Sequence, residues 1–246
     1  MNKTVLILGA SSGIARGTAG ALARRGHNLI LAGRDEEELQ RISSDLSIRY
    51  EIDTRIRLLD IVDLASYEEF CTTLLHEGEQ LSGIVCAVGY LGEQEKAFDD
   101  SGEAVKIIAS NYMGPALLLD RLANMMLPHK QGFIVGIASV AGDRGRQSNF
   151  LYGSAKGGFA LFLQGLRNRL FREGIRVLTI KPGFVDTAMT YGLSGMFLVA
   201  QPEDIGEDIV RALEKGRDSI YLPRFWRYIM LIIRLIPEKI FKRMGL

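Results

Sequence analysis

Short apolar runs, rich in β-branched residues, recur along this chain between longer segments whose apolar residues repeat with the period of a helix. The runs predict seven strands, at residues 5–8, 28–33, 55–60, 83–88, 133–139, 176–182 and 219–222. Helical spacing between them is clearest at Leu39, Ile42 and Leu46, and in the segment that Pro202 opens. Strands that are apolar on both faces and separated by helices indicate a parallel sheet covered on both sides. We therefore predict a doubly wound α/β fold with a seven-stranded parallel sheet and helices on both faces.

The length and composition fit one domain with a C-terminal extension. The chain has 246 residues, 47% of them hydrophobic, which is enough apolar side chain for one sizeable core. No internal repeat or linker-like segment divides residues 1–222, which we assign to this domain, and residues 223–246 form a tail. Lysine and arginine number 30 against 29 acidic residues, so the net charge gives no reason to expect a nucleic-acid partner.

The cysteines and the N-terminus indicate an intracellular protein. Cys71 and Cys86 lack metal-ligand spacing, so we interpret both as core thiols in a reducing compartment and predict no metal site. The first apolar run is four residues long and ends at a glycine turn, which is typical of a strand and not of an export signal. No apolar stretch approaches the roughly 18 to 20 residues that a membrane-spanning helix needs. We expect a cytoplasmic protein, either soluble or peripheral at the inner face of the membrane.

A glycine-containing turn follows the first predicted strand. It reads Gly9-Ala10-Ser11-Ser12-Gly13-Ile14, and a helix is expected directly after it. Glycines let the backbone turn sharply and approach a pyrophosphate, and the free amides of a helix N-terminus attract its negative charge. A tight turn of this kind also occurs without a ligand, but dinucleotide-binding Rossmann folds bind phosphate at this position. We therefore predict a Rossmann fold with a dinucleotide site here.

Charged residues follow the next two strands. In dinucleotide-binding folds an acid after the second strand binds the adenosine ribose, whereas an arginine favours the extra phosphate of NADP. Arg34 stands there, so we predict NADP(H) as the preferred cofactor over NAD(H); the alternative is a solvated arginine that opens a helix. Asp60, which ends the third strand, is placed either to face the adenine or to cap the following segment.

The candidate reacting residues are Ser139, Tyr152 and Lys156. Tyr152 and Lys156 lie one helical turn apart and share a face of the predicted helix. A phenol with a pKa of about 10 is a poor proton shuttle at neutral pH, and a nearby ammonium group lowers that pKa. Ser139 ends a strand, where open α/β sheets bind ligands, and its hydroxyl is suited to hold a carbonyl oxygen. We predict a tuned acid/base pair with an orienting serine.

These features together resemble the short-chain dehydrogenase/reductase family from the first strand through about Leu222. The resemblance rests on the glycine turn, on Ser139, Tyr152 and Lys156, on Asn111 in SNYMG, and on KPGFVDT at residues 181–187. It implies transfer of hydride from a nicotinamide to a carbonyl carbon, with Tyr152 giving the proton and Ser139 orienting the oxygen. Lys156 would bind the nicotinamide ribose, and Asn111 would position a water of the proton relay. The resemblance also implies nicotinamide contacts from Pro182, Gly183, Val185 and Thr187.

Two positions depart from the family pattern. The third glycine of the turn is Ala15 here, which adds one methyl group at a close contact between helix and strand. The family's Asn-Asn-Ala-Gly turn after the fourth strand reads Cys86-Ala87-Val88-Gly89, so the bracing side-chain amides are missing. We expect a rearranged hydrogen-bond network there, with Gly89 still letting the backbone approach the adenosine ribose.

Three functions fit these residues. The first is an NADPH-dependent carbonyl reductase. The second is an epimerase or dehydratase of nucleotide sugars, although such enzymes usually carry a longer C-terminal substrate domain than this chain has room for. The third is a non-enzymatic NADP-binding regulator, against which the intact Asn, Ser, Tyr and Lys set speaks. The resemblance also implies a homo-oligomer.

Two further segments bear on the substrate. The loop after Thr187 is rich in apolar residues, namely Met189, Tyr191, Leu193, Met196, Phe197 and Leu198. They either form a lid over a bulky ketone or pack the loop against the domain. The tail, residues 224–246, carries a net charge of +5 and predicts an amphipathic helix. Its apolar arc consists of Phe225, Trp226, Ile229, Ile232, Ile233 and Ile236, with Arg227 and Arg234 opposite. The arc would face anionic membrane lipid, another subunit or its own domain.

The tail, GYLG at 89–92 and AGDRGRQSN at 141–149 are also similar to a subset of the family, the decaprenylphosphoryl-2-keto-ribose reductase-like enzymes. This resemblance implies a lipid-linked keto-sugar as the carbonyl substrate, reduced at a membrane that the tail contacts.

Overall fold

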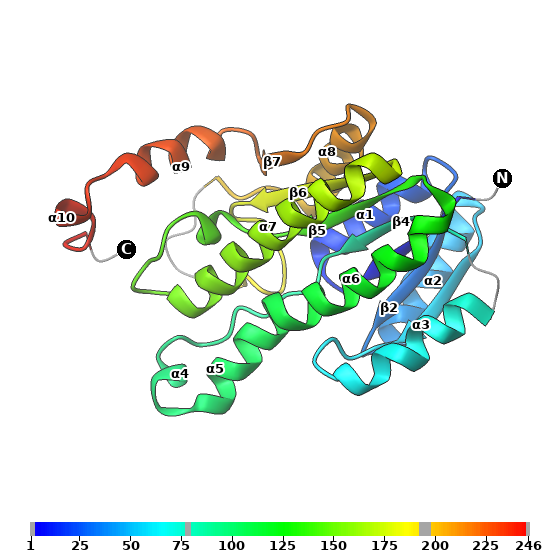
Figure 1. Cartoon of the computed structure of the whole chain (residues 1–246), viewed down its shortest axis with the longest axis horizontal. Helices are drawn as coiled ribbons and strands as arrows, with labels where there is room; N and C mark the ends of the chain where they lie inside the picture. Colours follow the sequence, from blue (N-terminus) through cyan, green and yellow to red (C-terminus); the bar gives the residue numbers. More distant parts are fainter. Residues whose placement is uncertain (1–2, 77–79, 192–197, 245–246) are drawn as a thin grey trace.

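The computed structural model describes residues 3–76, 80–191 and 198–244, and its centre is a parallel sheet (Figure 1). The strand order is β3-β2-β1-β4-β5-β6-β7. The strands are β1 (Thr4–Leu8), β2 (Asn28–Gly33), β3 (Thr54–Leu58), β4 (Leu81–Cys86), β5 (Gly132–Ile137), β6 (Ile175–Pro182) and β7 (Ser219–Leu222). Each overlaps one of the predicted runs, and every neighbouring pair is parallel. The predicted doubly wound α/β fold is confirmed.

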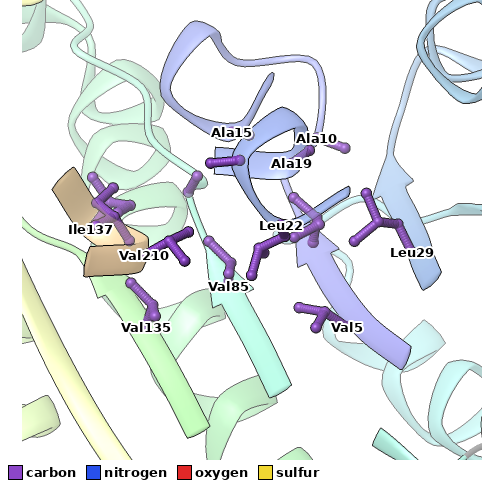
Figure 2. Packing of buried hydrophobic residues seen from close by; sticks show 14 of the residues in the cluster. Val5, Ala10, Ala15, Ala19, Leu22, Leu29, Val85, Val135, Ile137 and Val210 are labelled. Carbon is purple, nitrogen blue, oxygen red and sulfur yellow. The ribbon is translucent and has the colours of Figure 1, made fainter. Parts of the chain in front are cut away.

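Helices cover both faces of the sheet because successive side chains of each strand point to opposite sides. Val5 and Ile7 of β1 pack against one layer, formed by α1 (Gly13–Ala23), α2 (Glu36–Tyr50) and α8 (Pro202–Glu214). Figure 2 shows part of this core, with Leu22 of α1 and Val210 of α8 above the strands. Leu6 and Leu8 pack against the other layer, formed by α3 (Tyr67–His76), α6 (Gly114–Met126) and α7 (Phe150–Leu170).

Helices α1 and α8 meet backbone to backbone. A Cβ atom added to Gly17 of α1 would lie 2.0 Å from the carbonyl oxygen of Pro202, and one added to Gly206 of α8 would lie 2.1 Å from the carbonyl carbon of Gly17. Only hydrogen fits at both positions. The contact fixes the N-terminal end of α1, and with it the turn that precedes the helix.

Shorter elements connect the layers. After β4 come α4 (Lys96–Asp99), α5 (Ser101–Ile108) and a π-helical turn, Ala109–Met113, that leads into α6. Single 3₁₀ turns lie at Leu64–Ser66, Leu127–His129, Val140–Asp143 and Phe171–Glu173. Cys86 is buried and Cys71 is half-buried. Within the described ranges, no group of three metal-ligating side chains comes together, and no helix is long and apolar enough to span a bilayer.

The tail forms α9 (Trp226–Leu235) and α10 (Glu238–Phe241), which project at one end of the molecule (Figure 1). Trp226 and Met230 are buried in a small cluster with Val140 and partly buried Phe184 and Tyr221. The predicted apolar arc therefore divides: Ile229 and Ile233 also face the domain, whereas Ile232 is 65% exposed. One face of the tail thus packs on its own domain.

Arg144 holds the end of α9 in place. Its guanidinium donates to the carbonyl oxygens of Ile233 (2.9 Å), Arg234 (3.1 Å) and Ile236 (2.7 Å) at the end of the helix, where most carbonyl groups lack an intrahelical donor. It also pairs with Glu238 at 3.0 Å and lies 4.0 Å from the ring centroid of Phe241. A charged group with this many acceptors fixes the tail to the segment that follows Ser139.

Candidate functional site

A cleft of about 390 Å³ opens at the carboxyl ends of the strands, where the chain turns from β1 to β2 on one side and β4 lies on the other. Ligands of open α/β sheets bind at such a switch point. The cleft collects nearly all the predicted site residues, namely Gly9, Ser11, Ser12, Gly13, Ile14, Arg34, Asp60, Gly89, Ser139, Tyr152, Lys156, Pro182, Gly183, Val185 and Thr187. Asn111 lies behind the wall and is fully buried, and its neighbour Ser110 lines the cleft.

The turn after β1 fits a pyrophosphate. Gly9 has φ +75°, and a Cβ there would lie 3.0 Å from the backbone of Val88. The Ser12 hydroxyl caps α1 by accepting from the amide of Ala15, whereas the amides of Gly13 and Ile14 have no acceptor within the described chain. Two free amides at the start of an 11-residue helix form an anion site. The residues present therefore fit a dinucleotide.

The two charged residues of the adenosine end differ in their surroundings. Arg34 is exposed at the cleft and forms no ion pair with any described residue, so its guanidinium is free to bind a phosphate. Asp60 lines the cleft, and its carboxylate accepts from the amide of Val62 at 3.1 Å, so it caps the following segment; its contact with an adenine remains a prediction.

Helix α7 places Tyr152 and Lys156 on one face toward the cleft, beside Ser139 at the end of β5. The Lys156 ammonium donates to the carbonyl oxygens of Val88 (3.1 Å) and Ile137 (3.0 Å), so it ties the ends of β4 and β5 to the helix. The Ser139 hydroxyl accepts from the amide of Ala141 at 3.1 Å, which fixes its rotamer. Ser139 and Lys156 are thus held before any ligand binds.

The chain belongs to the short-chain dehydrogenase family. The sequence pattern of that family, described as short chain dehydrogenase, matches residues 3–195, which is most of the chain. Membership makes this protein an NAD(P)-dependent oxidoreductase, as the cleft geometry indicates.

The relatives agree with this assignment. An uncharacterized oxidoreductase of Mycobacterium tuberculosis is 35% identical over 98% of this chain and 96% of its own length. An uncharacterized oxidoreductase of Streptomyces coelicolor is 29% identical with the same coverage. Among solved structures, a short-chain dehydrogenase from Sphingobium yanoikuyae with NADPH superposes with TM-score 0.81 at 22% identity, over 96% of this chain and 97% of that one. NAD⁺-bound xylitol dehydrogenase superposes with TM-score 0.79 at 18% identity, over 89% and 97%. The structures at these identities show a shared fold.

Burial dominates the pKa values of the catalytic pair. It raises the pKa of Tyr152 to about 12, an effect that a hydrogen bond with Ser139 reduces, and it lowers the pKa of Lys156 to about 8. The prediction that the ammonium lowers the phenol pKa is wrong for the free protein. The Lys156 nitrogen lies 6.0 Å from the Tyr152 ring centroid and is bonded to backbone carbonyls instead.

These two pKa values predict how ketone reduction depends on pH. A lysine is cationic below its pKa, so Lys156 carries its charge at neutral pH and loses it as the pH rises through about 8. Tyr152 keeps its proton up to about pH 12 and can donate it throughout. We expect kcat/KM for reduction to be constant near neutrality and to fall above about pH 8, measured with one soluble ketone at saturating NADPH. A profile that stays flat to pH 10 would show that the charge of Lys156 is not required.

Asn111 occupies the π-helical turn before α6. Such turns are rare and often mark functional positions, because the extra residue redirects a side chain. Its amide nitrogen donates to the carbonyl oxygens of Tyr90 (2.5 Å) and Ile107 (2.8 Å), and its oxygen accepts from the amide of Tyr90 (3.1 Å). The side chain therefore braces the loop after β4, and its predicted water contact remains a prediction.

The loop after β4 is braced from outside, as expected from the missing amides. Ser12 donates to the carbonyl oxygen of Ala87 and Lys156 to that of Val88. A Cβ on Gly89 would lie 3.2 Å from both the Asn111 oxygen and the Lys156 nitrogen, so this glycine lies at the catalytic end of the cleft. Its predicted approach to the adenosine ribose remains a prediction.

Two residues near the cleft, Asp143 and Gln94, make contacts that were not predicted. Asp143 accepts from Lys181 (2.5 Å) and from the Tyr221 hydroxyl (2.6 Å), which joins the turn after Ser139 to β6 and β7. Gln94 lies in the loop after β4 and accepts from the amide of Leu151, so it caps α7 next to Tyr152. The sequence of the segment AGDRGRQSN, at residues 141–149, gives no indication of the partners of Asp143.

The segment from Pro182 to Thr187 runs along the cleft. Val185 bridges to Ala200, and the Thr187 amide donates to the Thr190 hydroxyl at 3.1 Å. Of the predicted lid residues, Met189 lines the cleft, whereas Tyr191 and Leu198 are exposed. Leu193, Met196 and Phe197 lie outside the described residues.

Proposed function

We propose that the protein is an NADPH-dependent carbonyl reductase. The observation that carries this proposal is the meeting, in one cleft, of the free amides of α1, an unpaired Arg34, and the Ser139, Tyr152 and Lys156 set. Cofactor-binding and proton-donating groups are useful together only if a redox step and a proton transfer occur at one place.

When bound, NADPH supplies a hydride to the carbonyl carbon. The chain's own residues do the rest. Ser139 binds the carbonyl oxygen, and Tyr152 donates its proton to that oxygen as negative charge develops there. With a pKa of about 12 the phenol is fully protonated at neutral pH, which is the form that a proton donor needs. Lys156 binds the nicotinamide ribose with its ammonium group, which in the free protein donates to the carbonyl oxygens of Val88 and Ile137.

The other two functions have less support. The elements described after Thr187 are α8, β7 and the tail, and both α8 and the tail pack on the same domain, unlike the separate substrate domain of nucleotide-sugar epimerases. A non-enzymatic regulator would not need Ser139, Tyr152 and Lys156 together at the cleft.

The cofactor preference should depend on Arg34. In Arg34→Asp the carboxylate repels the 2′-phosphate of NADPH and can instead bind the ribose hydroxyls of NADH. We expect the ratio of kcat/KM for NADPH to that for NADH to fall by at least about tenfold, the effect of losing one charged contact. The matched control is Arg41→Asp, an exposed arginine whose partner is Glu38 on the same helix. An unchanged ratio in Arg34→Asp would remove Arg34 from the cofactor site.

We further propose a bulky apolar ketone as substrate, with a lipid-linked keto-sugar as the first candidate. Met189 on the cleft wall and the basic tail, which packs on Val140 one residue after Ser139, support a substrate that is part lipid. Exposed Leu117 and Leu161 on α6 and α7 support association with a second copy.

The reductase proposal is tested by following NADPH oxidation over small ketones, nucleotide keto-sugars and polyprenyl-phosphate keto-sugars. We expect turnover with the lipid-linked class to exceed that with the nucleotide class. Absence of turnover across all three classes would contradict the reductase, and a preference for nucleotide sugars would contradict the lipid-linked substrate.

A further inference from the structure

The face of α9 that points away from the domain is apolar. We call Tyr228, Leu231, Ile232 and Leu235 the outer stripe; their exposed fractions are 67%, 54%, 65% and 72%. Positions i, i+3, i+4 and i+7 form one line along a helix, and this line lies opposite Trp226 and Met230, which are buried. A helix with apolar residues on two opposite faces is normally covered on both.

The charge around the outer stripe is almost entirely positive. The tail has six basic residues, all exposed, namely Arg224, Arg227, Arg234, Lys239, Lys242 and Arg243. Its single acid, Glu238, is paired with Arg144. The tail therefore carries +5 in a chain whose net charge is +1, which leaves −4 for the remainder. The cations flank an apolar stripe that has no partner within the described chain.

These charges decide what covers the stripe. A second copy placed on it about a two-fold axis would bring one +5 segment against another, and like charges repel. An anionic lipid surface complements both features, because headgroups attract the cations while the acyl boundary accepts Tyr228, Leu231, Ile232 and Leu235. We propose that the outer stripe and its basic flank dock the protein on an anionic membrane surface.

Docking through α9 would also hold the cleft at the surface. The inner face of α9 packs on Val140, one residue after Ser139, and Arg144 fixes its far end. We therefore expect α9 and the turn at Val140–Asp143 to approach the membrane together. This inference rests on the tail's own contacts and stands whether or not the substrate is lipid-linked.

The test is co-sedimentation of the full chain with phosphatidylcholine vesicles, with and without phosphatidylglycerol. Point variants are needed, because removing the tail would also remove buried Trp226 from the domain. We expect Ile232→Asp/Leu235→Asp to lower binding to the anionic vesicles by at least about tenfold. The matched control, Ile48→Asp/Leu75→Asp, changes two exposed apolar residues on α2 and α3 and should bind as the wild type does.

A second pair of variants tests the charge. Lys239→Gln/Lys242→Gln/Arg243→Gln should weaken binding by about tenfold or more, and added salt should have less effect on what remains. The control removes the same residue types elsewhere, as Lys130→Gln/Lys215→Gln/Arg217→Gln, all exposed. Equal binding by tail variants and controls would overturn the proposal.

Two further measurements separate the alternatives. If Ile232→Asp/Leu235→Asp lowers the molar mass in light scattering and leaves vesicle binding intact, a second copy covers the stripe and the membrane proposal is wrong. NADPH oxidation with a water-soluble ketone should be unchanged in both tail variants, which also shows that they fold. Lack of turnover in the wild type would contradict the reductase function and leave the vesicle result standing.

Discussion

Replacing Tyr152 with phenylalanine is expected to lower kcat/KM for ketone reduction by about 10²- to 10⁴-fold, the usual contribution of a positioned acid or base. The substitution removes one oxygen from a half-buried side chain and leaves the ring in place. The free amides of Gly13 and Ile14 and the guanidinium of Arg34 are untouched. NADPH affinity, measured by fluorescence titration, should therefore change little.

The matched control is Tyr50→Phe, which makes the same chemical change in α2, outside the residues that line the cleft. It should keep full activity. If Tyr152→Phe turned over ketone at the wild-type rate, the proton would come from another group. If instead it lost turnover but preserved the cellular role, the protein would act as an NADP-binding regulator.

Gly17→Ala is expected to destabilise the fold by up to about 2 kcal/mol, although alanine is the better helix former. The gain in helix propensity is about 1 kcal/mol. Against it, the new methyl group would lie 2.0 Å from the carbonyl oxygen of Pro202, which is backbone and cannot rotate away. Forcing α1 and α8 apart disturbs a packed layer, and overpacking of this kind costs about 1–3 kcal/mol and occasionally more, so the clash outweighs the gain.

The control for this prediction is Gly165→Ala in α7, where nothing lies within 4 Å of the added Cβ. Only the propensity gain remains there, so this variant should be more stable than the wild type by about 0.5–1 kcal/mol. Urea denaturation of both variants gives the comparison. A Gly17→Ala protein as stable as Gly165→Ala would mean that the two helices are not in backbone contact.

The sheet could be predicted from the sequence because its central strands are buried on both faces. Such strands are continuous apolar runs, as at 28–33 and 133–139, and the pattern alone locates them. The proximity of the candidate catalytic residues was predictable for a different reason. Tyr152 and Lys156 are neighbours on one helix, and a strand end before a turn places Ser139 at the same edge of the sheet.

What the sequence could not supply depends on partners distant along the chain. The pKa of Tyr152 depends on burial and on where the Lys156 ammonium finds its acceptors, which are carbonyl groups of β5 and the β4 loop. The helical wheel of the tail showed an apolar arc but not which part the domain covers, because that depends on Arg144 and Val140, more than 80 residues earlier. The partners of Asp143 could not be predicted for the same reason, because Lys181 lies on β6 and Tyr221 on β7, both distant along the chain.

The contacts of Arg144 have a consequence for hydrogen exchange. Opening α9 would expose Trp226 and Met230 and would deprive the guanidinium of three carbonyl partners at once, so the helix and the turn at Val140–Asp143 should open together. Their amides should then exchange with a common opening free energy, below that of the central strands. The tail and the loop after Ser139 would form a single cooperative unit. A change that loosens α9 would therefore also loosen the backbone next to Ser139.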